Sequence, residues 1–276
     1  MDLNKLTEQD IKKMSYNELI GLVRETNRIP GGAQTIAYIA SMCCLREGKR
    51  VLDIGTSTGN TAIDIASLSG AEVIGIDINE NSLAEAQKRA EIVGVDSKIT
   101  FELNDAMNLS LPDNFFDVVI CGNVTSLLSD KDKALSEYKR VLRNTGFLVA
   151  VPMYYIKKPS DQLIQDVSDA IQVNIKPLYK DFWINFFTKG DFEIFLEKDF
   201  AFDVLDEEKI NHFCDSILSR EHLKDLNENA ASALKEVYRK YMLLFRYNLS
   251  HMGYTILILR KSHKEIDSEL FTAHAL

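Results

Sequence analysis

The sequence lacks the features that mark several protein classes. It has only four cysteines in 276 residues, Cys43, Cys44, Cys121 and Cys214, and their spacing fits no metal site. We therefore expect free core thiols, a reducing cytoplasmic location and no bound metal. No run of about 18 apolar residues occurs, so we expect no membrane-spanning helix and no membrane partner. Residues 1–5 lack the basic and then apolar layout of a signal peptide.

Basic residues are also in the minority. Lys and Arg number 32 against 41 Asp and Glu, which gives a net charge of -9. A protein that binds nucleic acid usually presents an excess of basic side chains, so nucleic acid is not an expected partner. We expect a small-molecule substrate and a monomer or homodimer. The hydrophobic content of 46% allows a substantial core.

Two nucleotide-binding motifs are absent, although a suitable strand and turn are present. Residues 50–54 predict an apolar strand, and residues 55–59 form a glycine-bearing turn before a helix. A dinucleotide-binding G-x-G-x-x-G would need glycines where Ser57 and Asn60 stand. A phosphate-binding loop would need Gly-Lys followed by Ser or Thr, and no such tripeptide follows the strand. Because glycine lets the backbone approach a ligand closely, the turn still indicates a nucleoside cofactor of another kind.

Short apolar runs alternate with helical patterns along most of the chain. The runs are continuous in Val, Ile and Leu, which predicts strands that are buried on both faces of a largely parallel α/β sheet. Ligands of such sheets bind at the carboxyl ends of the strands. The predicted strands cover residues 50–54, 72–76, 98–103, 116–121, 147–153, 191–197 and 253–259.

Helix boundaries are indicated by capping residues. Residues 7–28 predict one N-terminal helix, which contains the capping-box spacing of Ser15–Glu18. A second such box, Ser82–Glu85, is expected to open the helix after the second strand. A further helix should start at Asp130 and end at Gly146 in a left-handed C-terminal cap.

The predicted elements divide the chain into four parts. We expect a helical cap at 1–33, a core at 34–198 and 251–262, a helical insertion at 199–250, and a tail at 263–276. The insertion follows a strand that ends on the ligand side of the sheet. We therefore expect it to form a lid together with the N-terminal helix.

The ordered series of motifs resembles that of the class I S-adenosylmethionine-dependent methyltransferases. It starts with Asp53 and the turn at 55–59, in which Ser57 replaces the middle glycine of the family pattern. It continues through Asp77 and ends with the helix at 134–142. Further matching segments lie at 101–106, 111–112 and 115–117, so about residues 35–155 resemble the family core.

The resemblance implies a fold and an activity. The fold is a Rossmann-like, doubly wound sheet of seven strands, mostly parallel with the last strand antiparallel, to which the lid is added. The activity is methyl transfer from S-adenosylmethionine to a small molecule.

The resemblance also implies which residues bind the cofactor. Asp53 would face the methionine part, and the following helix N-terminus would favour the methionine carboxylate. The turn would pack against the cofactor through Gly55, Thr56, Ser57 and Gly59.

Further cofactor residues follow the later strands. Asp77 would bind the ribose hydroxyls, with Ile78 against the adenine. Asp105 would accept a hydrogen bond from the adenine amino group, and the N–H of Ala106 would face a ring nitrogen. Asn123 would contact the methionine end.

Methyl transfer is an in-line displacement in which alignment matters most, and a base is needed only if the acceptor must lose a proton. If the sheet has the family's strand order, His251 is the candidate general base and Tyr154 a second catalytic candidate. Tyr154 and Tyr155 should point in opposite directions along a strand, so at most one of them faces the pocket. The candidate substrate residues are Tyr16, Arg28, Tyr155 and Trp183.

Several alternatives remain open at this level. The nucleophile could be O, N or C. Residues 121–124 lack the prolines that nucleic-acid amino-methyltransferases of this fold carry after the fourth strand, which disfavours base amines. Alternative functions are a protein or RNA methyltransferase, with the insertion as recognition module, and a non-methylating S-adenosylmethionine-binding protein of the same fold.

Overall fold

A computed structural model describes residues 3–25, 28–189, 191–203 and 206–261 of the chain. Its centre is one eight-stranded sheet in the order β3-β2-β1-β4-β5-β8-β6, with β7 also paired to β8. The strands are β1 Arg50–Ile54, β2 Glu72–Asp77, β3 Ile99–Leu103, β4 Phe116–Gly122, β5 Leu142–Ala150, β6 Met153–Tyr155, β7 Phe192–Ala201 and β8 Met252–Lys261. β1 to β5 are parallel and β8 is antiparallel to all its neighbours, as predicted.

The strand count differs from the expected seven because the predicted fifth strand is two strands. β5 ends at Ala150, and β6 starts after Pro152, which has no N–H to donate to a sheet ladder. Gly253 and Tyr254 of β8 pair with β6 as well as with β7. β6 therefore lies on the same edge of β8 as β5 and continues it after the interruption.

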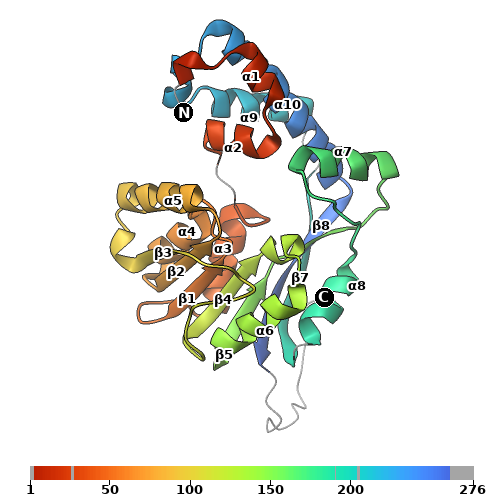
Figure 1. Cartoon of the computed structure of the whole chain (residues 1–276). Coiled ribbons are helices and arrows are strands. Elements are labelled where there is room, and N and C mark those ends of the chain that lie inside the picture. Colours follow the sequence, from red (N-terminus) through yellow and green to blue (C-terminus); the bar gives the residue numbers. More distant parts are fainter. Residues whose placement is uncertain (1–2, 26–27, 190, 204–205, 262–276) are drawn as a thin grey trace.

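Helices cover both faces of the sheet (Figure 1). The helices are α3 Gly32–Met42, α4 Asn60–Ser69, α5 Glu80–Val93, α6 Lys131–Val141 and α8 Lys180–Thr188. Val118 and Ile120 of β4 belong to the cluster with α3, α4 and α5, whereas Val119 and Cys121 belong to the cluster with α6 and α8. Consecutive residues of one strand thus point to opposite faces and are all buried, which confirms the two-sided burial predicted from the apolar runs.

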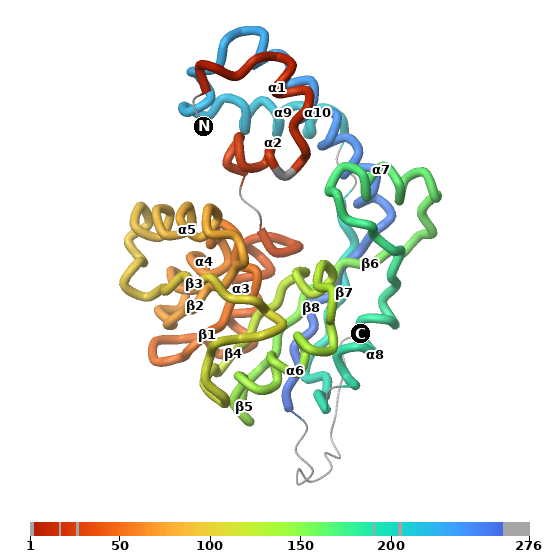
Figure 2. Tube along the Cα trace, in the orientation of Figure 1, coloured from red at the N-terminus to blue at the C-terminus, as the bar shows by residue number. Residues whose placement is uncertain are grey.

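A third hydrophobic cluster joins the N-terminal helices and the helices that precede β8 into one helical layer. Its elements are η1 Leu3–Lys5, α1 Glu8–Lys13, α2 Tyr16–Val23, α9 Glu207–Leu218, η4 Glu221–Asp225 and α10 Glu228–Leu249. Ile11 and Leu19 of the N-terminal helices are buried there with Ile210, Leu234 and Tyr238 of the insertion. This layer, which we name the cap, lies above the strand ends at the top of Figures 1 and 2.

The helix α7, Asp161–Ile171, lies beside α2 and α10 although its sequence falls in the segment assigned to the core (Figure 1). The proposed division into domains stays a prediction, and the tail at 263–276 lies outside the described residues. None of the helices described here is long and apolar enough to cross a membrane.

Three helix boundaries differ from the predicted ones. The helix expected at 7–28 is two helices, because Met14 is extended and Ser15 starts a new capping box with Glu18. That second helix ends at Arg24, which adopts a left-handed conformation with φ of 52°. The Ser15 box itself is confirmed.

The other two differences concern α5 and α6. α5 starts earlier than expected, because the Asn79 side chain accepts hydrogen bonds from the N–H groups of Asn81 and Ser82. α6 starts after Asp130 as predicted but ends at Val141, and the chain enters β5 directly. Gly146 therefore lies in a strand and caps no helix.

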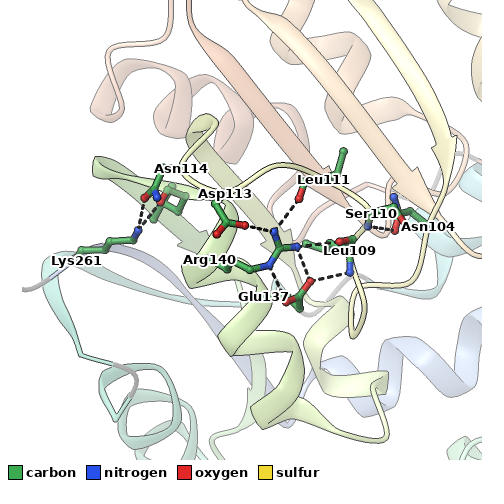
Figure 3. Close-up of polar contacts among 10 residues, drawn as sticks. Asn104, Leu109, Ser110, Leu111, Asp113, Asn114, Glu137, Arg140 and Lys261 are labelled. Atoms are coloured by element: carbon green, nitrogen blue, oxygen red, sulfur yellow. Dashed lines mark hydrogen bonds and ion pairs between the residues drawn. The ribbon is translucent and has the colours of Figure 1, made fainter.

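Arg140 of α6 fixes the long connection between β3 and β4 (Figure 3). Its guanidinium donates to the carbonyl oxygens of Leu109 and Leu111 at 2.8 Å each, and it pairs with Asp113 and Glu137. Glu137 also accepts a hydrogen bond from the N–H of Leu109 at 2.8 Å. This network ties residues 109–113 to the face of the sheet that α6 covers.

Candidate functional site

A cavity of about 660 Å³ lies where β1, β2 and β4 end, and we name it the strand-end cavity. Part of its wall is the turn after β1, contributed by Asp53, Gly55, Thr56 and Ser57. The ends of β2 and β4 contribute Asp77, Ile78 and Asn123. The structure thus brings together seven of the ten predicted cofactor residues, at the edge of a parallel sheet where ligands of such folds bind.

The turn after β1 has a shape that requires glycine. Gly55 has φ of 70°, and a Cβ placed on it would lie 2.6 Å from the Cγ2 atom of Val124. Thr56 donates its N–H to the carbonyl oxygen of Ile76 at 2.9 Å, which ties the turn to β2. Ser57 also has a positive φ, 51°, so its backbone is strained where the family has glycine. The backbone is therefore held close to the cavity.

Asp53 is a buried carboxylate at this wall. It is 4% exposed, and its Oδ2 atom has no hydrogen-bond partner among the described residues. Burial, aided by the charge of Asp77, raises the pKa of Asp53 to about 7. A buried acceptor without a donor is costly, so a cationic or N–H-bearing group bound here would be stabilised.

Asp77 is held by the backbone at the end of β2. One oxygen accepts a hydrogen bond from the N–H of Ser57 at 2.9 Å, and the other accepts from the N–H of Asn79 at 3.0 Å. Each carboxylate oxygen keeps further lone pairs for a ligand. The next residue, Ile78, is 76% exposed and lines the same cavity, so it presents apolar surface to a ring.

Asn123 links β4 to β6 at the cavity wall. Its Oδ1 atom accepts a hydrogen bond from the N–H of Met153 at 3.0 Å. The preceding Gly122 has φ of 44°. The side chain is therefore fixed through its oxygen, and the amide nitrogen is the group that remains for a ligand.

Three predicted cofactor residues do not line the strand-end cavity. Gly59 caps α4, and a Cβ on it would lie 2.8 Å from the Cβ atom of Ala86, so its role here is helix packing. Asp105 accepts a hydrogen bond from the N–H of Met107 at 2.8 Å, which closes its own turn, and Ala106 is buried in the core beside it.

A second cavity of about 790 Å³ lies between the cap and the sheet, and we name it the cap chamber. Tyr16, Tyr155 and Trp183, which were predicted to contact substrate, all line it. The cap chamber and the strand-end cavity share four lining residues, Asn123, Leu127, Met153 and Leu249.

The polar groups of the cap chamber come from separate elements. Tyr155 donates its hydroxyl to Oδ1 of Asn248 at 2.7 Å, and both residues are buried. Glu25 accepts a hydrogen bond from the hydroxyl of Tyr238 at 2.5 Å, and burial raises its pKa. Trp183 is 1% exposed, and its indole N–H has no acceptor within the described chain.

The remaining candidates lie elsewhere. The hydroxyl of Tyr154 donates to Asp199 at 3.3 Å, and Tyr154 lines neither cavity, because strand alternation turns it away from Tyr155. His251 lines neither cavity, and its Nδ1 lies 3.0 Å from the carbonyl oxygen of Tyr247 at the end of α10. Arg28 lines the strand-end cavity and not the cap chamber.

Two arginines make contacts around the strand-end cavity, and one of them reaches the cap. Arg28 pairs with Asp64 of α4 at 2.6 Å. Arg89 of α5 donates to the hydroxyl oxygen of Thr58 in the turn at 2.9 Å and to the carbonyl oxygen of Arg24 at 3.3 Å. The end of α2 is thus joined to the turn that follows β1.

Sequence reasoning missed the contribution of α7 to the cap chamber. Val167 and Ile171 line it from this helix. The spacing of Leu163, Val167 and Ile171 places them on one helical face, which was a usable indication of a buried side. The spacing did not show that the helix faces the cap. In the described ranges, no group of three His, Cys, Asp or Glu side chains is arranged to hold a metal ion.

Comparisons with known proteins agree with this geometry. Residues 45–182, half of the chain, match the model of a family described as a methyltransferase domain. An uncharacterized protein from Haemophilus influenzae is 32% identical over 170 residues, which cover 61% of this chain and 68% of the relative. The crystal structure of MccD protein matches with a TM-score of 0.74 at 26% identity, covering 86% of this chain and 100% of that chain.

A relative with a named activity is the 27-O-demethylrifamycin SV methyltransferase of Amycolatopsis mediterranei. It is 36% identical over 122 residues, 44% of this chain and 45% of that protein. The chain thus spans about half of this relative's length. The matched family model, the fold and the cavity at the strand ends lead to one assignment: the chain belongs to the class I S-adenosylmethionine-dependent methyltransferases.

Proposed function

We propose that this protein methylates a small, largely apolar molecule that binds in the cap chamber, using S-adenosylmethionine bound in the strand-end cavity. The observation that carries the proposal is the wall shared by the two cavities, Asn123, Leu127, Met153 and Leu249. A donor in one cavity and an acceptor in the other would meet there. The rifamycin-modifying relative is named for a small-molecule reaction, which supports this substrate class.

The residues of the strand-end cavity suit the parts of this cofactor. The unpartnered oxygen of Asp53 suits the methionine ammonium group, and the fixed carboxylate of Asp77 suits the two ribose hydroxyls. Ile78 offers its exposed side chain to the adenine. When bound, S-adenosylmethionine supplies an electrophilic methyl group that a nucleophile takes by in-line displacement.

The protein's contribution to the reaction is alignment and exclusion of water. None of the four shared wall residues has an ionisable side chain, and three of them are apolar. Such a wall holds the acceptor atom in line and keeps solvent away from the reacting centre. Well-oriented pairs of this kind reach effective molarities of about 10⁵ M or more.

Asp77→Ala tests the cofactor assignment. We expect the affinity for S-adenosylhomocysteine, measured by calorimetry, to fall about tenfold to a hundredfold, because hydrogen bonds to a charged group are lost. Asp96→Ala, which removes the same charge from an exposed position in the 3-10 helix η2 Asp96–Lys98, should leave the affinity unchanged. Absence of binding by the unmodified protein at millimolar concentration would overturn the proposal. Formation of S-adenosylhomocysteine with any acceptor would exclude a non-catalytic role.

A further inference from the structure

The charged residues of the cap chamber are unusual for an acidic chain. Only Glu25, Lys131 and Lys176 among its lining residues carry a formal charge, so two of the three are basic. Over the whole sequence, acidic residues outnumber basic ones by 41 to 32. The chamber wall therefore reverses the charge balance of the chain.

Lys131 occupies a position that helix stability does not favour. It is the first residue of α6, where the helix dipole disfavours a cation. Its Nζ atom donates to the carbonyl oxygen of Leu128 at 2.7 Å and makes no ion pair with a described carboxylate. Burial lowers the pKa of Lys131, so the ammonium group is partly desolvated, and no described carboxylate pairs with it to offset this. A bound anion would compensate this cost.

Two more hydrogen-bond donors line the same chamber. Lys176, in the connection between α7 and α8, makes no ion pair with the described part of the chain. Trp183 of α8 has a buried indole N–H without an acceptor. Each of these groups can only donate, and a ligand oxygen that carries negative charge would suit all of them.

Glu25 belongs to the other side of the chamber. It lies in the cap near Tyr16, and the hydroxyl of Tyr238 already binds one of its oxygens. The charge of Arg220 offsets that of Glu25 within the cap. Because Glu25 is already partnered in the cap, Lys131 and Lys176 are the charged lining residues left to bind an anionic group, and the apolar body of the ligand would lie against Met242 and Phe245.

We propose that the acceptor is an apolar molecule with an anionic oxygen group, a carboxylate or a phosphate, which Lys131 and Lys176 bind at the core side of the cap chamber. This inference rests on the proposed function, because it assigns the chamber to the acceptor. The anionic end of the acceptor would then lie beside α6.

The sole tryptophan of the chain, Trp183, reports directly on the chamber, so its fluorescence can measure binding. Four probes of eight carbon atoms each, which differ in their head group, are titrated into protein saturated with S-adenosylhomocysteine: octanoate, octyl phosphate, 1-octanol and octylamine. We expect at least one of the two anions to bind about tenfold more tightly than octanol, and octylamine to bind more weakly than octanol. The ranking of octanoate against octyl phosphate distinguishes a carboxylate from a phosphate.

Lys131→Met keeps the apolar stem of the side chain and removes the charge. It should weaken binding of the preferred anion about tenfold and change octanol binding less than about twofold. Lys133→Met is the matched control, because Lys133 is exposed on the same helix and does not line the chamber. It should change neither affinity.

Three results would overturn the inference: octanol or octylamine binding as tightly as both anions, no anion binding at millimolar concentration, or equal effects of the two lysine variants. Calorimetric titration of S-adenosylhomocysteine on the same samples tests the proposed function separately. If that titration fails, the probes are ranked on the unloaded protein, which still tests the charge preference of the chamber.

Discussion

The strand-end cavity and the cap chamber are built in different ways. The strand-end cavity takes most of its wall from three short segments, each of which directly follows a strand of the sheet. The cap chamber takes its wall from α2, α6, β6, α7, α8 and α10, which come from widely separated parts of the chain. Backbone geometry decides the first site, whereas side-chain packing between distant elements decides the second.

Gly55→Ala should have the largest effect, because it disturbs the backbone turn that shapes the strand-end cavity. The added Cβ meets Val124 at 2.6 Å, and the φ of 70° is unfavourable for alanine. We expect the affinity for S-adenosylhomocysteine to fall about a hundredfold in calorimetric titrations. Adding Val124→Ala should restore part of the loss, because it removes the atom that the new methyl group meets.

Gly94→Ala is the control for strain alone. Gly94 has φ of 79°, but a Cβ there meets no atom within 4 Å. It should lower the free energy of unfolding by about 1 kcal/mol and leave cofactor affinity unchanged. Equal affinity losses for the alanine variants of Gly55 and Gly94 would show that the close approach to Val124 does not matter.

The second prediction concerns the ionisation of Asp53, whose pKa is raised from 3.8 to about 7 by burial. Between about pH 4 and pH 7 the folded protein keeps a proton on Asp53 that the unfolded chain releases. The contribution of Asp53 to the free energy of unfolding is therefore fully present below about pH 4 and is lost as the pH rises to about 7. Asp53→Asn should remove that loss, with a gain in unfolding free energy at pH 8 of at most about 4 kcal/mol.

The same substitution should weaken cofactor binding. The ionised carboxylate suits an ammonium group, so affinity in the unmodified protein should rise with pH up to about 7 and then level off. The asparagine variant should show a flat profile and about tenfold weaker binding at pH 8. Calorimetry across this pH range measures the profile, and a pH-dependent asparagine variant would assign the titration to another group.

The smallest effect is expected at Arg89, which joins the two regions. Arg89→Ala removes the hydrogen bonds to Thr58 in the turn and to Arg24 at the end of α2. Arg28, Ile29 and Pro30 follow Arg24 in the chain and line the strand-end cavity. Loosening Arg24 should therefore lower the affinity for S-adenosylhomocysteine about fivefold. Lys88→Ala changes the same charge on an exposed face of α5 and should leave the affinity unaltered. Similar losses of affinity in both variants would show that the hydrogen bonds of Arg89 to Thr58 and Arg24 do not contribute to cofactor binding.

Local patterns were sufficient to predict the part of the site that follows the strands. Gly55, Ser57 and Asp77 lie where their order in the sequence placed them, because a parallel sheet brings the carboxyl ends of neighbouring strands to one edge. Asp105 shows the limit of this reasoning within the same sheet. Its carboxylate could close a local turn or face a ligand, and the spacing alone does not distinguish the two.

The cap chamber was predictable only in part. Alternation along a strand implied that at most one of Tyr154 and Tyr155 faces the substrate pocket, and Tyr155 is the one that lines the cap chamber. The two tyrosines differ in their hydrogen-bond partners: Tyr154 binds Asp199 of β7, and Tyr155 binds Asn248 of α10. Lys131 has no motif around it, and its significance depends on its forming no ion pair with a described carboxylate, which only packing reveals.

The sequence by itself determined the class of the fold, the antiparallel last strand expected from the family resemblance, and the glycine turn that forms a wall of the strand-end cavity. The fold class depends on hydrophobic period, and the turn depends on backbone conformations that few residues can adopt. Only the tertiary structure decided that α7 lies beside α2 and α10, that Tyr154 and His251 line neither cavity, and that two lysines line the cap chamber. Those outcomes depend on which side chains from distant parts of the sequence come into contact, and local sequence patterns do not specify such contacts.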